Sequence, residues 1–424
     1  MERKITLELT KWKKDKLKKP LLLYGVPGCG KTYTTLEFGR TQYKNLIYFD
    51  CSNNLELNYV FEKNTSLEKL IRGLSAISLE TILKEESLVI FDNVSEKVLK
   101  SVRKLFSQDN SYHIIMISND QEIVKNGKST DITIKKMNLV DFSEYLKYTG
   151  KEQMIDFIID SFKNNKPMPF HNMAFESFND YVLTGGYPNA IVNYKESGDL
   201  NLLSSFHEKN IAVIKSGLLS LDSLIDIKRS IEVFDSVSLQ LLKDNKKFLY
   251  GMIKPGGRAK DYVSSIDFMT KNNLLIKCNK ISDIISPLNK QKDDESFKLY
   301  YNDSGILLKK MNVCSNKALT NEKLLNIIYE NNVASTLSQN GFNLYYYHSD
   351  GKSEMDLVLQ TRTGKLIPIE FLKDEVSTRS KSMSVILAKY DLQYAIRFTY
   401  GNFRIKNKIA YVPYYASFCI TEMM

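Results

Sequence analysis

The sequence predicts an α/β fold in its N-terminal third, built on a parallel sheet with helices between the strands. A short apolar strand, residues 21–24 (LLLY), runs directly into a glycine-rich turn and then into helical sequence. Three more apolar runs follow at 46–49, 87–91 and 113–117, with helical sequence between them. Apolar runs separated by helices are the pattern of parallel strands that are buried on both faces.

The turn after the first strand carries a phosphate-binding motif. It reads GVPGCGKT and matches G-x-x-x-x-G-K-[ST], the Walker A motif or P-loop, at every fixed position. Its glycines let backbone N–H groups surround phosphates, Lys31 reaches the β and γ phosphates, and the Thr32 hydroxyl is a ligand for Mg²⁺. We therefore predict ATP and Mg²⁺ as cofactors. The predicted nucleotide contacts in this segment are Gly25, Val26, Pro27, Gly28, Cys29, Gly30, Lys31, Thr32 and Tyr33.

A second acid for the metal is found at the end of a later strand. Asp92 closes the run SLVIFD, 60 residues after Thr32, as a Walker B carboxylate does. The alternative interpretation is an aspartate that caps the next helix. Asn119 follows the strand at 113–117, where a polar side chain can hydrogen-bond the γ-phosphate or the attacking water, or simply begin a turn. Asn93 follows Asp92, and an amide cannot act as a base.

These segments carry a family resemblance. LLLYGVPGCGKT, NLIYFDC, LVIFDNV and YHIIMIS together resemble the bacterial and archaeal AAA-type ATPases that end in a restriction-endonuclease-like domain of unknown function. The resemblance runs nearly from end to end. It implies a P-loop NTPase core over residues 1–138, with Lys31, Asp92 and Asn119 as its catalytic residues. That family typically has Glu after the Walker B Asp, so Asn93 predicts nucleotide binding with impaired hydrolysis.

The middle of the chain is predicted to form two modules. Residues 139–227 are mostly amphipathic helix and are expected to form a helical lid. Within them the segment GGYPNA places Pro188 at the start of a helix; the resemblance implies contact with the nucleotide base, and the alternative is a plain turn between helices. Residues 228–315 read as a winged-helix-like module, in which Arg258 either contacts DNA or senses phosphate.

The last predicted domain spans residues 316–424. A helix followed by alternating strands is the core of a restriction-endonuclease-like α/β fold, whose nucleases hold Mg²⁺ with three acids. Glu330, Asp356 and Glu370 match those acids and form a possible second metal site. The water-orienting lysine is missing, because Leu372 stands at its position, with Lys373 on the opposite face of the strand and Lys381 further along. The alternative is a degenerate domain retained for packing or binding.

Composition excludes several classes of protein. The 424 residues are 43% hydrophobic and 25% charged, which is globular and neither disordered nor fibrous. Five scattered cysteines without a C-x-x-C pair argue against a disulfide framework or a zinc module. The net charge is +10, and residues 1–20 hold eight basic residues against three acidic ones. This start lacks the apolar core of a signal peptide and no run suits a membrane span, so we expect a cytoplasmic protein without a membrane partner.

Three functions are compatible with these observations. The first is an ATP-binding switch with slow hydrolysis, which couples its nucleotide state to the C-terminal domain and acts on DNA or RNA. The second is an ATP-regulated, Mg²⁺-dependent nuclease. The third is a non-catalytic module that binds protein partners or assembles into a homo-oligomer when ATP is loaded.

Overall fold

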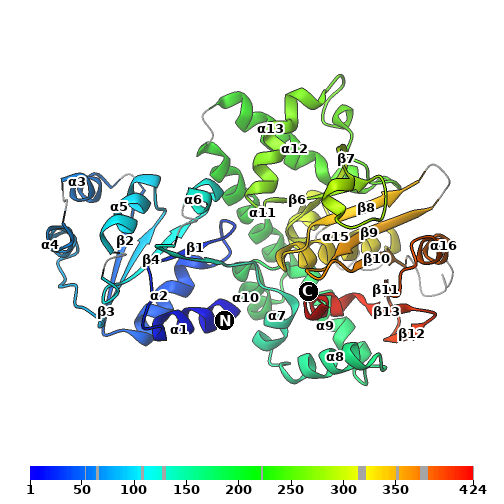
Figure 1. Ribbon diagram of the computed structural model, residues 1–424, viewed down its shortest axis with the longest axis horizontal. Helices are drawn as coiled ribbons and strands as arrows, with labels where there is room; N and C mark the ends of the chain where they lie inside the picture. The colour runs from blue at the N-terminus through cyan, green and yellow to red at the C-terminus, as the bar shows by residue number, and fades with distance from the viewer. Residues whose placement is uncertain are drawn as a thin grey trace. The chain divides into compact units, whose positions relative to one another are not determined.

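The chain folds into two units, Met1–Leu139 and Val140–Met424. The first ends one residue beyond the predicted boundary at residue 138. The computed structural model (Figure 1) describes residues 1–52, 54–63, 66–106, 109–126, 130–220, 223–313, 321–349, 353–372 and 381–423.

The first unit is built on the predicted parallel sheet, which the structure confirms. Its five strands have the order β2-β3-β4-β1-β5. Every residue of β3 and β4 is buried, as expected for central strands that are covered on both faces. The sequence does not predict β5, because its residues TIKK contain no apolar run. The strands are β1 (Leu21–Tyr24), β2 (Asn45–Asp50), β3 (Ser87–Asp92), β4 (His113–Ser118) and β5 (Thr133–Lys136).

Helices connect these strands and pack on them through apolar faces. In α5, for example, Val98, Leu99 and Val102 are buried at helical spacing. The basic N-terminal segment is also a packed helix, since Ile5, Leu9 and Trp12 of α1 are buried. The helices of this unit are α1 (Lys4–Lys14), α2 (Lys31–Gln42), α3 (Leu55–Lys63), α4 (Leu67–Ser78), α5 (Glu96–Phe106) and α6 (Gln121–Asn126).

The strand order aligns the polar groups of the predicted site. Parallel strands end at the same edge of a sheet, and β4 lies between β3 and β1. Asn119, which follows β4, therefore lies between Asp92 and the P-loop. On the other side, β2 pairs with β3 so that Asp50 is directly opposite Asp92.

The second unit begins with a series of helices. The predicted helical region, residues 139–227, is helical, and α7 begins with a capping box between Asp141 and Glu144. Among the described residues, no helix has both the length and the apolar character to cross a membrane. The α-helices are α7 (Phe142–Tyr148), α8 (Gln153–Asn164), α9 (His171–Thr184), α10 (Pro188–Ser197), α11 (Leu200–Gly217), α12 (Leu224–Leu241), α13 (Ala259–Lys271), α14 (Ser304–Lys310), α15 (Glu322–Gln339) and α16 (Lys381–Lys389), and the 3₁₀ helices are η1 (Leu218–Ser220), η2 (Tyr250–Met252), η3 (Leu288–Gln291) and η5 (Tyr414–Met423).

One mixed sheet of eight strands runs through the rest of this unit, in the order β12-β13-β11-β10-β9-β8-β6-β7. The hairpin β6–β7 comes from the region predicted as a winged helix, and β6 pairs in parallel with β8. Strands from 228–315 and from 316–424 thus share one sheet, which crosses the predicted module boundary. The strands are β6 (Leu275–Ile281), β7 (Lys292–Tyr301), β8 (Leu344–His348), β9 (Glu354–Gln360), β10 (Leu366–Phe371), β11 (Ala395–Thr399), β12 (Arg404–Lys406) and β13 (Ile409–Pro413).

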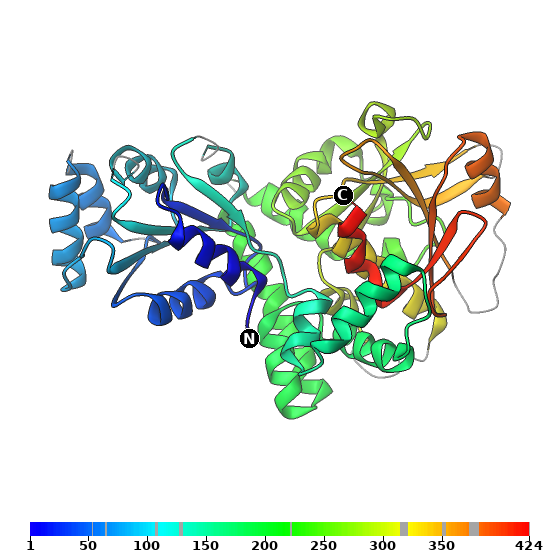
Figure 2. The ribbon, with the colours of Figure 1, turned by 60° about the horizontal axis from the view of Figure 1, so that its bottom comes forward.

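The helices of 139–227 pack on the C-terminal end of the chain. Figure 2 shows η5, in red, beside the green-cyan helices α7 and α8, and both of these contact it. Rings from α9 and η5 meet, with Phe175 and Tyr415 at 5.4 Å and perpendicular. The Asn402 side chain forms two hydrogen bonds with the backbone of Met168: its Oδ1 accepts from the N–H at 2.7 Å and its Nδ2 donates to the carbonyl at 2.9 Å. The helices predicted as a lid are therefore bound to the C-terminal part by specific contacts.

Candidate nucleotide-binding site and a polar cavity

The P-loop has a conformation that its glycines make possible. Gly28 and Gly30 have φ of 79° and 97°, the left-handed region that suits glycine. A Cβ on Gly25 would lie 2.2 Å from the backbone oxygen of Met137, so this position also requires glycine. Gly30 is the N-cap of α2, which directs the N–H groups of the first helical turn toward the loop. This geometry fits a phosphate group.

Lys31 is the buried cation of the site. Its ammonium donates to the carbonyls of Gly25 and Val26, each at 2.9 Å, and to Asn119 Oδ1 at 2.7 Å. Burial lowers the pKa of Lys31, against the opposing effects of Cys29 and Asp92. The structure thus brings Asn119 to the P-loop lysine, as expected if β4 lies between β3 and β1.

Thr32 and Asp92 form the pair that fits Mg²⁺. The Thr32 hydroxyl donates to Asp92 Oδ2 at 2.6 Å, and the Tyr48 hydroxyl donates to the same oxygen at 3.1 Å. Burial, followed by the charge of Asp92, raises the pKa of Tyr48. Mg²⁺ in nucleotide sites is commonly held by one or two protein oxygens together with phosphates. A hydroxyl and a carboxylate in contact at the edge of the sheet fit that requirement.

The side chain of Asn93, the residue after Asp92, contacts the end of the neighbouring strand β2. Asn93 has φ of 53°, and its Nδ2 donates to Asp50 Oδ1 at 3.0 Å. Ser52 donates to the same Asp50 oxygen from its backbone N–H at 2.9 Å and its hydroxyl at 2.7 Å. Burial raises the pKa of Asp50, but these hydrogen bonds hold it below its ordinary value. Asp50 is therefore an ionised carboxylate at the edge of the sheet.

Arg3 is a site residue that sequence analysis does not identify. Its guanidinium donates to the backbone oxygen of Cys29 at 2.8 Å and to that of Asn138 at 2.7 Å, and only 5% of its surface is exposed. Arg3 thus connects the N-terminal segment to the P-loop. Of the other predicted contacts, Val26 and Cys29 are buried and the Tyr33 ring is exposed.

Pro188 and Arg258 belong to the second unit. Pro188 begins α10, as predicted, and the glycines before it are fixed by Asp303. The buried Asp303 accepts from the N–H of Gly186 at 2.6 Å, and a Cβ on Gly185 would lie 2.6 Å from both of its oxygens. Arg258 is the exposed N-cap of α13. Their proposed contacts with a nucleotide remain predictions.

The three predicted C-terminal acids do not line one common site. Glu330 on α15 and Asp356 on β9 line a cavity of about 600 Å³, together with Lys246 and Lys298. Glu370 on β10 accepts a hydrogen bond from Nε of the buried Arg397 at 2.7 Å, forms an ion pair with its Nη2 at 2.7 Å, and does not line the cavity. Among the residues that the structure describes, no group of three His, Cys, Asp or Glu side chains is arranged to hold a metal ion.

The two acids of the cavity have different partners. Glu330 accepts from Tyr300 at 2.7 Å and is paired with Lys246. Burial raises the pKa of Glu330, but Lys246 and Lys298 bring it below its ordinary value. Burial, and then the charge of Glu330, raises the pKa of Asp356 to about 6. These lysines come from elements outside the predicted nuclease core, so sequence spacing within that core does not indicate them.

The lysine position of the predicted nuclease motif is apolar in the structure. Leu372 is buried, and its backbone N–H donates to the Phe398 oxygen at 3.0 Å. Lys373 lies outside the described residues. Lys381 begins α16, but its side chain is not among those that the structure describes. The described cations of the cavity are therefore supplied by other segments.

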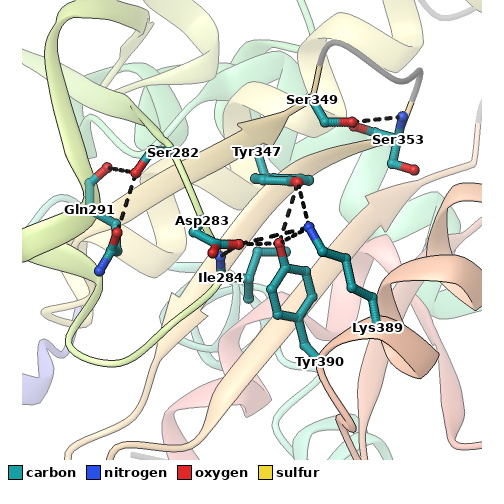
Figure 3. A network of polar contacts seen from close by, with 9 residues as sticks. All are labelled: Ser282, Asp283, Ile284, Gln291, Tyr347, Ser349, Ser353, Lys389 and Tyr390. Carbon is teal, nitrogen blue, oxygen red and sulfur yellow. Dashed lines mark hydrogen bonds and ion pairs between the residues drawn. The ribbon is translucent and has the colours of Figure 1, made fainter.

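A polar cluster at one side of the cavity fastens α16 to the sheet. Figure 3 shows Lys389 and Tyr390 directed toward Asp283 and Tyr347. Lys389 donates to the Tyr390 hydroxyl at 2.8 Å, and that hydroxyl bonds Asp283 and lies 3.3 Å from the Tyr347 hydroxyl. Tyr347 also lines the cavity. This cluster anchors the end of α16 to β8 and to the loop after β6.

Comparisons with known families divide the chain into three matched segments. Residues 17–146 match a family model described as an AAA domain. Residues 175–317 and 326–416 match two domains of unknown function, DUF8612 and DUF4143. No curated protein matches the chain.

Three solved structures are similar at low identity. A Walker-type ATPase of Pyrococcus abyssi is 14% identical, with 73% of this chain and 95% of that chain covered and a TM-score of 0.42. A STAND protein with a tetratricopeptide repeat sensor from Pyrococcus horikoshii is 12% identical, with coverages of 80% and 45% and a TM-score of 0.25. The Aeropyrum pernix ORC1 protein, solved in complex with DNA, is 11% identical, with coverages of 74% and 91% and a TM-score of 0.27.

Each of these TM-scores is below 0.5, which is too low to support an assignment. The first unit is therefore assigned from the family model and from the geometry of the site. The matched segment contains the P-loop, the Thr32–Asp92 pair and Asn119 on one parallel sheet. The N-terminal part of this chain is an AAA-type P-loop ATPase domain.

Proposed function

We propose that this protein is an ATP-dependent switch that binds ATP with Mg²⁺ firmly and hydrolyses it slowly. One observation carries the proposal: Lys31 contacts the P-loop carbonyls and the Thr32 hydroxyl contacts Asp92, which suits phosphate and Mg²⁺, while residue 93 offers an amide where a carboxylate is expected. General base catalysis contributes about 10²- to 10⁴-fold to rate. Relative to a typical turnover of about 10 s⁻¹, a site without an efficient base is expected to work at about 10⁻¹ to 10⁻³ s⁻¹.

The test measures binding and turnover on the full chain. Titration with ATP and Mg²⁺ should show binding that Lys31→Ala abolishes, and the nucleotide recovered from the protein should be partly unhydrolysed ATP. Steady-state phosphate release should be slow. Rapid turnover that Asn93→Ala abolishes would contradict the proposal, because the proposal requires slow hydrolysis with the amide at residue 93.

For the second unit we propose a role in binding nucleic acid that changes with the nucleotide state. The support is a set of exposed basic residues, Arg258, Lys260 and Lys271, on or next to α13. A basic helix can contact a phosphate backbone or a groove. Binding of labelled DNA and RNA, with and without ATP, should fall when the three residues become alanine and should weaken with salt.

We further propose that the C-terminal part does not cleave nucleic acid. Glu330 is already paired with Lys246 and Tyr300, and Glu370 with Arg397, which favours a packing role for both acids. Incubation of plasmid and of single strands with Mg²⁺ or Mn²⁺ should leave them intact. Cleavage that Asp356→Asn abolishes would establish the nuclease alternative instead.

A further inference from the structure

The carboxylate that residue 93 lacks is present on the neighbouring strand. Asp50 ends β2 and is paired with Asp92 across the sheet. Adjacent strands lie about 4.8 Å apart, so a side chain at the end of β2 reaches the space above the end of β3. Asn93 Nδ2 makes that connection with its 3.0 Å hydrogen bond to Asp50 Oδ1.

The hydrogen bonds of Asp50 and Asn93 determine which of their side-chain oxygens can still accept a hydrogen from water. A carboxylate only accepts, so the Asn93 amide must present its NH₂ group to Asp50 and its carbonyl Oδ1 is directed away. Asp50 Oδ1 already accepts from Asn93 and twice from Ser52. Within the described part of the chain, Asp50 Oδ2 has no hydrogen-bond partner. One carbonyl oxygen and one carboxylate oxygen thus remain to accept hydrogens from a water molecule.

We propose that Asp50 is the general base of ATP hydrolysis in this domain, and that Asn93 is its positioning residue. Asn93 Oδ1 accepts one hydrogen of the attacking water and orients it. Asp50 Oδ2 takes the other proton as the water oxygen bonds to the γ-phosphorus. The bond from that phosphorus to the β–γ bridging oxygen breaks, and its electron pair leaves with ADP. A base held on the neighbouring strand instead of at residue 93 is consistent with slow turnover.

This inference depends on the proposed function, so the experiment separates the two. Nucleotide binding is measured first, because none of the variants changes Lys31, Thr32 or Asp92. A wild-type chain that does not bind ATP would remove the proposed switch. A wild-type chain that binds ATP but shows no phosphate release in single-turnover assays with labelled ATP would leave the switch and overturn the role of Asp50.

Two variants test the base itself. Asp50→Asn should lower the single-turnover rate at least tenfold while ATP affinity changes less than threefold, since a general base contributes about 10²-fold or more. Asp109→Asn is the matched control. Asp109 accepts from the backbone N–H and hydroxyl of Ser111 two residues later, as Asp50 does from Ser52. An unchanged rate in Asp50→Asn, or an equal loss in Asp109→Asn, would overturn the assignment.

An exchange of the two residues distinguishes chemistry from structure. The double variant Asp50→Asn/Asn93→Asp keeps an amide paired with a carboxylate and moves the carboxylate to residue 93. Its rate should return at least to that of wild type. A double variant that binds ATP but is as slow as Asp50→Asn would overturn the proposal. If Asp50→Asn loses ATP binding, Ser52→Ala replaces it: loss of a hydrogen bond that positions Asp50 should lower the rate about threefold, and an unchanged rate would count against the proposal.

Discussion

The contact between Gly185 and Asp303 gives a sharp prediction about stability. Gly185 has φ of 67° and ψ of −170°, a region that is essentially restricted to glycine and costs other residues about 1–3 kcal/mol. In Gly185→Ala the new Cβ would also meet both Asp303 oxygens at 2.6 Å. Asp303 must then move and lose a charged hydrogen bond, such as that from Gly186, which costs about 1.5–3 kcal/mol more. The free energy of unfolding should fall by about 3–6 kcal/mol.

Gly198→Ala is the matched control for this variant. Gly198 also has a positive φ, of 63°, but no atom of the described residues lies within 4 Å of its added Cβ. Its cost should be about 1–2 kcal/mol. Most of the difference between the two variants should therefore come from the Asp303 contact.

The assay must distinguish unfolding of the second unit from unfolding of the first. The only tryptophan, Trp12, is in the first unit, so its fluorescence follows that unit during urea unfolding. Near-ultraviolet circular dichroism detects the tyrosines of the second unit as well. Gly185→Ala should shift the dichroism transition and leave the Trp12 transition unchanged. Equal shifts for Gly185→Ala and Gly198→Ala would refute the reasoning.

Three further predictions concern charged groups. Arg3→Met should weaken ATP binding about tenfold, because the guanidinium that joins the P-loop carbonyl of Cys29 to that of Asn138 is lost, whereas Lys11→Met in the adjoining helix α1 should have no effect in the same titration. Burial raises the pKa of Asp303 to about 6, so the folded state holds this proton more tightly; relative to Asp303→Asn, the wild-type second unit should lose about 2 kcal/mol of stability as the pH rises from 4 to 7, measured by urea midpoints. Glu370→Gln should cost about 3–5 kcal/mol, since the buried Arg397 loses its carboxylate partner, whereas Glu354→Gln should cost less than 1 kcal/mol; a loss at Glu370 that Mn²⁺ restores would indicate a metal ligand instead.

Sequence reasoning is most specific where the chemistry is contiguous. The P-loop is one segment of eight residues, and the spacing of the motif predicts a role for its glycines, lysine and threonine. Asp92 ends an apolar strand and Asn119 follows one, and adjacent strands in a parallel sheet bring such residues together.

The residues that sequence reasoning misses have partners that only the fold defines. Arg3 contacts Cys29 and Asn138, which are 26 and 135 residues away. The pairing of Asp50 with Asn93 depends on the register between β2 and β3, which the apolar pattern does not determine. Glu370 satisfies the spacing of a metal ligand. Its partner is instead Arg397, because the pairing of β10 with β11 places Arg397 directly opposite Glu370.

The pairing of β6 with β8 has a mechanical consequence for the second unit. A sheet transmits displacement along its hydrogen-bonded strands, so a force on the β6–β7 hairpin is carried to the strand that holds Asp356. A truncated chain that ends near residue 315 would leave the edge of β6 unpaired, and such an edge is a template for aggregation. The two regions that match separate family models are therefore expected to fold and move as one body.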